Sequence, residues 1–469
     1  MWTSINQALN IIDNFVWGVP LMVLIIAGGL LLTIRLGLLQ IRKLPLALKW
    51  MLQNEEGGKG EISSFSALCT ALSATIGTGN IVGVATAVCA GGPGALFWMV
   101  VAAFLGMATK YSEGLLAVKY RTVAEDGHSL GGPFYYIELG MGKKFKWLAK
   151  IFAFFGVCVG LFGIGTFSQV NGISSAVHGF FDPNDAFTVK ILPFLGEYSW
   201  SVVIASLILS FCVAAVLIGG VKRIASVSQI IVPFMAVIYF VFAVILICCN
   251  ITKVPAAFAT IVTAAFSPKA ITGGAVGSML IAMQKGVARG IFSNEAGLGS
   301  APIAAAAAQT NSPVRQGLVS MTGTFIDTII ICTLTGLSIV LTGAWQVEGL
   351  EGVQVTTYAF QHGLPFPAQF SSFILMLCLV FFAFTTILGW DYYSERCLEY
   401  LSGGNMKHVK IFRWIYILAV FIGPYMTVSA VWTIADIFNG LMAIPNMIAL
   451  FALSGVIVKE TRAFFQHAK

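Results

Sequence analysis

Charged residues are scarce in this chain, and their scarcity decides its class. Asp, Glu, Lys and Arg make up 10% of the 469 residues, against roughly one quarter in soluble domains, whereas hydrophobic residues make up 58%. The mean hydropathy is +0.88. So few charges exclude an ordinary soluble surface and predict an all-α polytopic membrane protein embedded in a lipid bilayer. The net charge of +7 is then a matter of loop topology and does not indicate nucleic-acid binding.

Motifs for enzymatic chemistry are also missing. There is no GxxxxGK[ST] loop, so ATP is not expected to drive the protein, and there is no His-Glu-x-x-His. The nine cysteines are scattered without a CxxC and without a nearby histidine, which predicts neither a disulfide framework nor a metal-ligating cluster. The five histidines lie in loops, at span ends or in the tail. We therefore do not expect an enzyme or an organic cofactor.

Long apolar segments are abundant. A helix of about 20 residues crosses roughly 30 Å of hydrocarbon. No Lys or Arg precedes Arg35, so the basic region of a cleavable signal is missing and the first span is expected to remain as a helix. Eleven transmembrane helices are predicted, at about 15–38, 64–90, 94–118, 147–180, 200–219, 227–250, 272–308, 316–343, 369–393, 411–432 and 437–457.

The basic residues of the loops predict the orientation. One alternate set of loops holds 20 Lys and Arg residues, and the other holds only Lys190, Lys253 and Lys269. Because cytoplasmic loops carry the excess of Lys and Arg, the N-terminus is predicted outside and the C-terminus in the cytoplasm. A plasma membrane, the inner membrane of a bacterium, is the expected location.

Two apolar spans are interrupted by residues that suit a helix poorly. The sequence Ile-Gly-Thr-Gly-Asn interrupts one span at 76–80, and Gly-Ile-Phe-Ser-Asn-Glu-Ala-Gly-Leu-Gly-Ser interrupts another at 290–300. Unwound backbone at membrane depth is tolerated only where it is buried in protein or faces a water-filled cavity. Such a break exposes N–H and C=O groups to an anionic substrate head and a small cation, which favours a transporter. The alternative is that the glycines only help helices to pack.

The two breaks lie five spans apart, in helices that cross the membrane in opposite directions. That spacing predicts a 5+5 inverted repeat with the site where the broken helices meet. The predicted organisation is an extra helix and cytoplasmic loop at 1–62, a first five-helix repeat at 63–250, an inverted repeat at 251–458 and a cytoplasmic tail at 459–469.

Other polar residues fall within the spans. Gln169 and Asn171 are mid-span amides that need hydrogen-bonding partners. Thr386 and Trp390 share a helix face at i, i+4, and Thr385 adjoins them. A membrane threonine often bonds only its own helix carbonyl, and a tryptophan near a span end can be simply interfacial.

Six charged residues fall within spans as well. Lys110 and Glu113, three residues apart, are interpreted as a structural ion pair near the inner interface. A second group is interpreted as a gating or stabilising charge network, with a proton-relay role for its carboxylates left open. Its members are Lys285, Arg289, Glu295 and Asp327.

The motifs carry a resemblance to a known family, the alanine or glycine:cation symporters, also called sodium:alanine symporters. The matching segments are 73–84, 91–98, 107–114, 132–136 and 292–302, and the similarity extends from about residue 15 to the C-terminus. The resemblance implies a leucine-transporter-like fold of one extra helix plus five and five inverted helices.

Site residues follow from this resemblance and not from spacing. The substrate carboxylate is expected at the backbone N–H groups of Thr78, Gly79 and Asn80. The substrate ammonium is expected at backbone carbonyls of the second break and at the side chain of Asn294. Gln169, Thr386 and Trp390 are expected to close the pocket, and Trp390 to limit the size of the substrate side chain. Sodium is expected at the carbonyls of Ala74 and Gly77 and the hydroxyls of Thr385 and Thr386. Oxygen ligands without a nearby carboxylate suit a monovalent ion.

The expected function is import of a small neutral amino acid, alanine or glycine, coupled to Na⁺ by alternating access. Alternatives are an H⁺-coupled or glutamine-selective symporter of the same fold, or a facilitator that does not concentrate its substrate. A non-transporting sensor is disfavoured because no soluble signalling domain is apparent.

Overall fold

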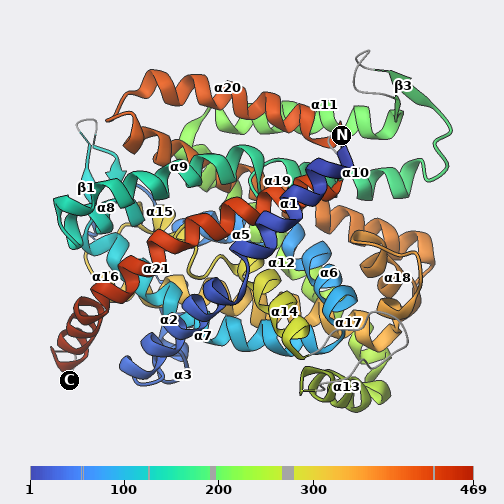
Figure 1. Ribbon diagram of the computed structural model, residues 1–469, viewed down its shortest axis with the longest axis horizontal. Coiled ribbons are helices and arrows are strands. Elements are labelled where there is room, and N and C mark those ends of the chain that lie inside the picture. The colour runs from blue at the N-terminus through green and yellow to red at the C-terminus, as the bar shows by residue number, and fades with distance from the viewer. Residues whose placement is uncertain are drawn as a thin grey trace.

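The computed structural model describes residues 2–53, 55, 57–124, 127–190, 197–266, 279–425 and 428–467. In these residues the chain is almost entirely helical (Figure 1), which confirms the all-α prediction. Two short antiparallel hairpins are the only paired strands of the described chain. They are β1 (Thr122–Val123) with β2 (Ser129–Leu130), and β3 (Thr188–Lys190) with β4 (Glu197–Ser199).

In the first half, four helices precede α5, which leads into the first break. The bounds of the helices in this half are α1 (Trp2–Val16), α2 (Val19–Arg35), α3 (Leu39–Arg42), α4 (Leu44–Met51), α5 (Ser64–Thr75), η1 (Gly79–Gly83), α6 (Val84–Gly91), α7 (Gly94–Lys119), α8 (Pro133–Tyr135), η2 (Tyr136–Gly140), η3 (Lys143–Phe145), α9 (Lys146–Phe162), α10 (Phe167–Phe181), α11 (Trp200–Leu217) and α12 (Gly220–Cys249).

The second half contains the longest helices. Their bounds are η4 (Ile251–Lys253), α13 (Val254–Phe266), α14 (Met279–Asn294), α15 (Ala301–Ala305), α16 (Pro313–Thr324), η5 (Phe325–Cys332), α17 (Thr333–Thr342), η6 (Ala344–Gln346), α18 (Val353–Gly363), α19 (Ala368–Leu401), α20 (Met406–Ile422), η7 (Gly423–Tyr425) and α21 (Val428–His467). Helix α21 extends beyond the rest of the bundle at its C-terminal end (Figure 1).

Eight described helical stretches are long and apolar enough to cross a membrane, and the bent pair α5 and α6 with η1 adds a ninth. The eight stretches are Gln7–Arg35, Gly94–Lys119, Lys143–Phe181, Trp200–Leu217, Gly220–Cys249, Pro313–Thr342, Ala368–Leu401 and Thr433–Gln466. The spans predicted at 272–308 and 411–432 correspond to shorter helices. Helices α14, α15 and α20 have 16, 5 and 17 residues, and 272–278 lies outside the described residues.

Local sequence explains where the helices near the site begin and end. Ser63 caps α5, because its hydroxyl accepts the N–H of Ser66 at 3.0 Å. The same helix ends at Thr75, just before two glycines, and the chain bends by 51° between α5 and the following helix. A third interruption, at 163–166 between α9 and α10, was not predicted. The residues on both sides of this interruption are apolar, so hydropathy alone predicts one continuous span.

Helix α19 is the centre of the bundle. It packs against α5, α9, α10 and α12, and most of its side chains are buried. Gly389 allows the close approach of α5, because a Cβ there would lie 2.7 Å from the Cβ of Ala74. Trp390 is completely buried, so it is not an interfacial tryptophan. The site therefore lies on the side of α19 that faces the first break.

Candidate functional site

The first break is held by polar side chains from three helices. The side-chain oxygen of Asn80 accepts the N–H of Gly77 at 2.8 Å. Gln169 Oε1, from α10, accepts the N–H of Thr78 at 3.0 Å. Thr386 Oγ1, from α19, donates to the carbonyl of Ile76 at 3.3 Å. These bonds satisfy backbone groups that a continuous helix would have paired internally, as burial in a membrane requires.

Asp327 joins this break to the second broken helix. Its Oδ1 accepts Asn80 Nδ2 at 2.7 Å, and its Oδ2 accepts the hydroxyl of Ser293 at 2.9 Å. Thr328 donates to Oδ2 as well, at 2.6 Å. Asp327 lies in η5, a π-helical turn, and such turns often occur at functional sites. The sequence predicted Asp327 as a member of a charge network. No clear feature of the sequence predicts the π-helical turn that directs its carboxylate toward both breaks.

The two breaks are in direct contact at Gly79 and Ser293. A Cβ on Gly79 would lie 3.2 Å from the Cα of Ser293, so any larger residue would push the two segments slightly apart. Asn294, the last residue of α14, donates from Nδ2 to Thr328 Oγ1 at 3.0 Å, and its oxygen accepts the N–H of Ala296 at 2.9 Å. The structure thus brings the two predicted breaks together in the protein interior.

The second break follows α14 as a loop with left-handed backbone. Glu295 has φ 57°, and Gly297 and Gly299 have φ 91° and 83°. The Glu295 carboxylate accepts Trp390 Nε1 at 2.8 Å and the hydroxyl of Ser300 at 2.5 Å. A non-glycine residue with positive φ costs free energy, which these two bonds offset. Trp390 therefore anchors the loop of the second break to α19.

A clamp of Glu113, Asn446 and Tyr136 holds the same loop from the other side. Glu113 Oε1 accepts the N–H of Gly297 at 3.1 Å and Asn446 Nδ2 at 2.6 Å. Asn446 Nδ2 also donates to the Gly297 carbonyl at 2.9 Å, and its oxygen accepts the hydroxyl of Tyr136. Neither Asn446 nor Tyr136 was predicted, because a lone amide or phenol in an apolar span looks like any packing residue.

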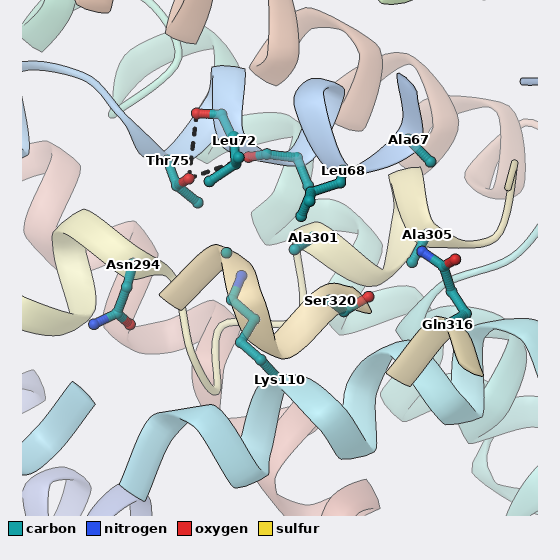
Figure 2. Close-up of a pocket in the computed structure, with 12 residues that line it drawn as sticks. Ala67, Leu68, Leu72, Thr75, Lys110, Asn294, Ala301, Ala305, Gln316 and Ser320 are labelled. Atoms are coloured by element: carbon teal, nitrogen blue, oxygen red, sulfur yellow. Dashed lines mark hydrogen bonds between the residues drawn. The ribbon is translucent and has the colours of Figure 1, made fainter. Parts of the chain in front are cut away.

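The predicted Lys110–Glu113 ion pair is not formed. Glu113 is completely buried and turns toward Gly297 and Asn446, away from the membrane interface. Lys110 Nζ has no hydrogen-bond partner among the described residues and extends toward a small cavity bordered by Asn294 and Ala301 (Figure 2). The spacing i, i+3 permits a pair on an isolated helix, but the loop of the second break competes for the carboxylate.

The other predicted charges separate into different contacts. Arg289 forms a bidentate ion pair with Asp436 of α21, with N–O distances of 3.0 and 2.7 Å. Lys285, one turn earlier on α14, acts electrostatically on Asp436 and on Asp13 of α1. Asp13 and Asp436 were not predicted, because both fall at the ends of apolar runs.

The structure gathers most of the predicted site residues at the junction of the breaks. These are Gly77, Thr78, Gly79, Asn80, Gln169, Asn294, Asp327 and Thr386. Thr385 points elsewhere, with its hydroxyl bonded to the carbonyls of Phe381 and Phe382 and 3.6 Å from Met235 Sδ. Ala74 faces α19 at Gly389.

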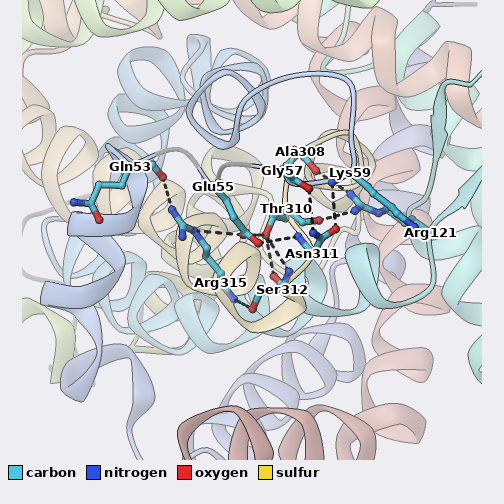
Figure 3. A network of polar contacts seen from close by, with 10 residues as sticks. All are labelled: Gln53, Glu55, Gly57, Lys59, Arg121, Ala308, Thr310, Asn311, Ser312 and Arg315. Atoms are coloured by element: carbon cyan, nitrogen blue, oxygen red, sulfur yellow. Dashed lines mark hydrogen bonds and ion pairs between the residues drawn. The ribbon is translucent and has the colours of Figure 1, made fainter. Parts of the chain in front are cut away.

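A polar network holds the chain after α15 (Figure 3). Arg121, at the end of α7, donates to the carbonyls of Ala306, Ala308 and Thr310 at 3.3, 2.8 and 2.5 Å. The loop before α5 lies over the same segment, where Glu55 accepts the Thr310 hydroxyl at 2.5 Å. Helix α15 has only five residues, and this network instead holds the carbonyls of the segment that follows it.

Comparison with known proteins identifies the family of this chain. The chain matches the sodium:alanine symporter family over residues 2–469. It is 47% identical to the sodium/alanine symporter AgcS of Methanococcus maripaludis, over 97% of this chain and 96% of that protein. It is 55% identical to an uncharacterized transporter of Haemophilus influenzae, over 99% and 97%.

A more distant relative is named for a different substrate. The chain is 36% identical to the probable sodium/glutamine symporter GlnT of Bacillus subtilis, over 100% of this chain and 92% of that protein. The family and these relatives are transporters, not enzymes. The chain therefore belongs to the sodium:alanine symporter family and is a multi-pass amino-acid/cation symporter.

Proposed function

We propose that the protein is a secondary active symporter that imports alanine or glycine together with Na⁺ across the plasma membrane. The observation that carries this proposal is the junction at Asp327, where Asn80 of one broken helix and Ser293 of the other donate to one carboxylate. The 47% identity to a sodium/alanine symporter supports this choice of substrate and ion over glutamine, whose named relative is 36% identical.

The amino acid would bind where backbone groups of the first break are held by neutral side chains. A substrate carboxylate can replace the Gln169 amide at the N–H of Thr78, and it would also meet Gly79 and Asn80. Asn294 and carbonyls of the second break would receive the substrate ammonium. Trp390 and Thr386 would close the pocket and limit the side chain to a small one, since both are buried beside the breaks.

Sodium would bind between the first break and α19, at the carbonyls of Ala74 and Gly77 and the hydroxyls of Thr385 and Thr386. The contact of Thr386 with the Ile76 carbonyl supports this location. Thr385 would have to turn from the carbonyls it now bonds. Ion binding would order the break and raise substrate affinity, and the substrate would raise ion affinity by the same factor.

The membrane arrangement we propose has eleven transmembrane helices, with residues 63–250 and 251–458 as inverted repeats. Residues 1–62 would supply the extra helix, and 459–469 a cytoplasmic tail. The N-terminus would lie outside and the C-terminus in the cytoplasm. Rocking of one helix bundle against the other would open the site alternately to the two sides.

The test is uptake of labelled alanine into proteoliposomes under an inward gradient of Na⁺, K⁺ or H⁺. We expect accumulation only with Na⁺. Accumulation with H⁺ alone would contradict sodium coupling, and flux without accumulation would indicate a facilitator.

Asn80→Ala and Asn294→Ala should each reduce uptake while the protein stays folded. Wild-type uptake by both folded variants would remove these residues from the pocket.

A further inference from the structure

A small cavity lies beside the two breaks, between α5, α7, α15 and α16 (Figure 2). Thr75 and Asn294, which end the helices before the two breaks, both line it. Its remaining walls are mostly the small or apolar side chains of Ala67, Leu68, Ala71, Leu72, Ala301 and Ala305. Its volume is about 10 Å³, enough for about one water molecule.

Two polar atoms of this cavity wall have no hydrogen-bond partner among the described residues. They are Lys110 Nζ and Gln316 Oε1, from residues that are 3% and 1% exposed. Burying an ammonium without a hydrogen bond is costly, and buried polar groups are nearly always paired. The two groups are one donor cation and one acceptor, which is the complement of a zwitterion between apolar walls.

The neighbouring carboxylates do not form hydrogen bonds with the Lys110 ammonium. Glu113, Glu295 and Asp327 all interact electrostatically with Lys110. Each of them accepts hydrogen bonds from other donors, namely Asn446, Trp390 and Asn80 among others. Glu113 Oε2 has no hydrogen-bond partner among the described residues, so it does not bind Lys110 either. Lys110 thus offsets the negative charge around the breaks while its three N–H bonds stay available to a ligand.

We propose that this cavity is an inner substrate subsite, in which Lys110 binds the carboxylate of the amino acid as it leaves the breaks and Gln316 then accepts a hydrogen bond from its ammonium. This inference rests on the proposed function and orientation, in which α5, α15 and the start of α16 lie on the cytoplasmic side. The cavity is too small for alanine until α5 and α15 separate, which is the motion that opens an alternating-access site inward.

The test compares Lys110→Met with Lys110→Arg, using Lys119→Met as the matched control. Lys119 lies on the same helix but pairs with Glu460 at 2.7 Å and does not line the cavity. We measure Na⁺-dependent alanine binding in detergent and alanine efflux from preloaded proteoliposomes. We expect Lys110→Met to slow alanine efflux about tenfold, because the hydrogen bond between the Lys110 ammonium and the substrate carboxylate is lost. We expect its alanine affinity to stay within about twofold of wild type, because that bond forms only on the exit path. Lys110→Arg and Lys119→Met should keep most of the efflux rate.

A merely structural lysine would give a different pattern. Wild-type efflux from folded Lys110→Met overturns the proposal, and so does a parallel loss of binding and efflux. If Lys110→Met does not fold, Gln316→Leu decides: we expect it to slow efflux about threefold with unchanged binding, and wild-type efflux overturns the proposal.

The anion could also come from the solution, and the internal buffer separates the two sources. We expect wild-type efflux to be unchanged when internal chloride is replaced by gluconate. An efflux rate that follows chloride in wild type but not in Lys110→Met would assign the cavity to an inorganic anion and overturn the proposal. Failure of the proposed function is distinct, because wild type itself would then show no Na⁺-driven alanine uptake.

Discussion

Buried polar side chains hold the backbone of both broken helices, but the kind of side chain differs between the two breaks. The first break is held mainly by neutral groups, the amides of Asn80 and Gln169 and the hydroxyl of Thr386. The second is held by the buried carboxylates of Glu113 and Glu295, which bind its loop to α7, α19 and α21. Neutral partners can be exchanged for a ligand at modest cost, whereas bonds to a buried charge are expensive to break.

The helices next to the breaks on the proposed cytoplasmic side differ too. Helix α5, before the first break, has twelve residues and its own N-cap at Ser63. Helix α15, after the second break, has five residues, and Arg121 binds carbonyls of the segment that follows it. The difference indicates that the first break is built to rearrange and the second to stay in place, with Asp327 as the shared link.

Removing the shared link should have the largest effect. Asp327→Asn keeps the shape but cannot accept bonds from Asn80, Ser293 and Thr328 in the same way. Since hydrogen bonds to a charged group contribute about 1.5–3 kcal/mol each, we expect alanine uptake to fall at least about a hundredfold. Asp185→Asn, on an exposed loop residue, is the control and should transport normally. Near-normal uptake by Asp327→Asn would mean that the link between the breaks is dispensable.

Filling space at the first break should reduce ligand binding more than stability. In Gly77→Ala the new Cβ would lie 2.5 Å from Thr386 Oγ1 and 2.9 Å from Gln169 Oε1, so both side chains must move. We expect alanine affinity to drop about tenfold or more, measured by binding in detergent, with the thermal unfolding midpoint close to wild type. An unchanged affinity would contradict the assignment of this break to the substrate.

Removing the clamp of the second break should instead lower stability. We expect Glu113→Ala and Asn446→Ala each to reduce the free energy of unfolding by about 2–3 kcal/mol, because each leaves a buried polar partner unpaired. The double variant should show a coupling free energy of about 0.5–3 kcal/mol. Thermal unfolding of the purified protein in detergent measures all three. Strictly additive effects would indicate that the two residues act separately.

A smaller loss is expected when the support of the segment after α15 is weakened. Arg121→Lys keeps the charge, but an ammonium cannot reproduce the planar contact with the carbonyls of Ala308 and Thr310. We expect a loss of about 1 kcal/mol in unfolding free energy and faster proteolysis of the segment after α15. Equal proteolysis of variant and wild type would show that the loop before α5 holds this segment unaided.

The smallest effect is expected far from both breaks, at the β3–β4 hairpin. Asp182 accepts the hydroxyl of Ser199 at 2.6 Å and the N–H of Ala186 at 2.8 Å, and these bonds lower the pKa of its carboxyl. A lowered pKa in the folded state stabilises the protein above the usual pKa of an aspartate and is lost as the pH falls through the lowered value. Asp182→Asn should flatten the acid side of the stability profile slightly and leave uptake at neutral pH unchanged. A loss of uptake would connect this hairpin to the site.

Sequence and tertiary structure determined different parts of this protein. The apolar spans, the helix breaks near Gly77 and Gly297 and the family motifs follow from local composition, because hydropathy and glycine act over a few residues. The partners of the buried charges do not. Glu113 binds Gly297 and Asn446 instead of Lys110, since residues separated by up to 333 positions compete for one carboxylate once the helices pack. The π-turn at Asp327 likewise forms where several helices meet, and so does the site of the Lys110 ammonium, which has no hydrogen-bond partner in the described part of the chain.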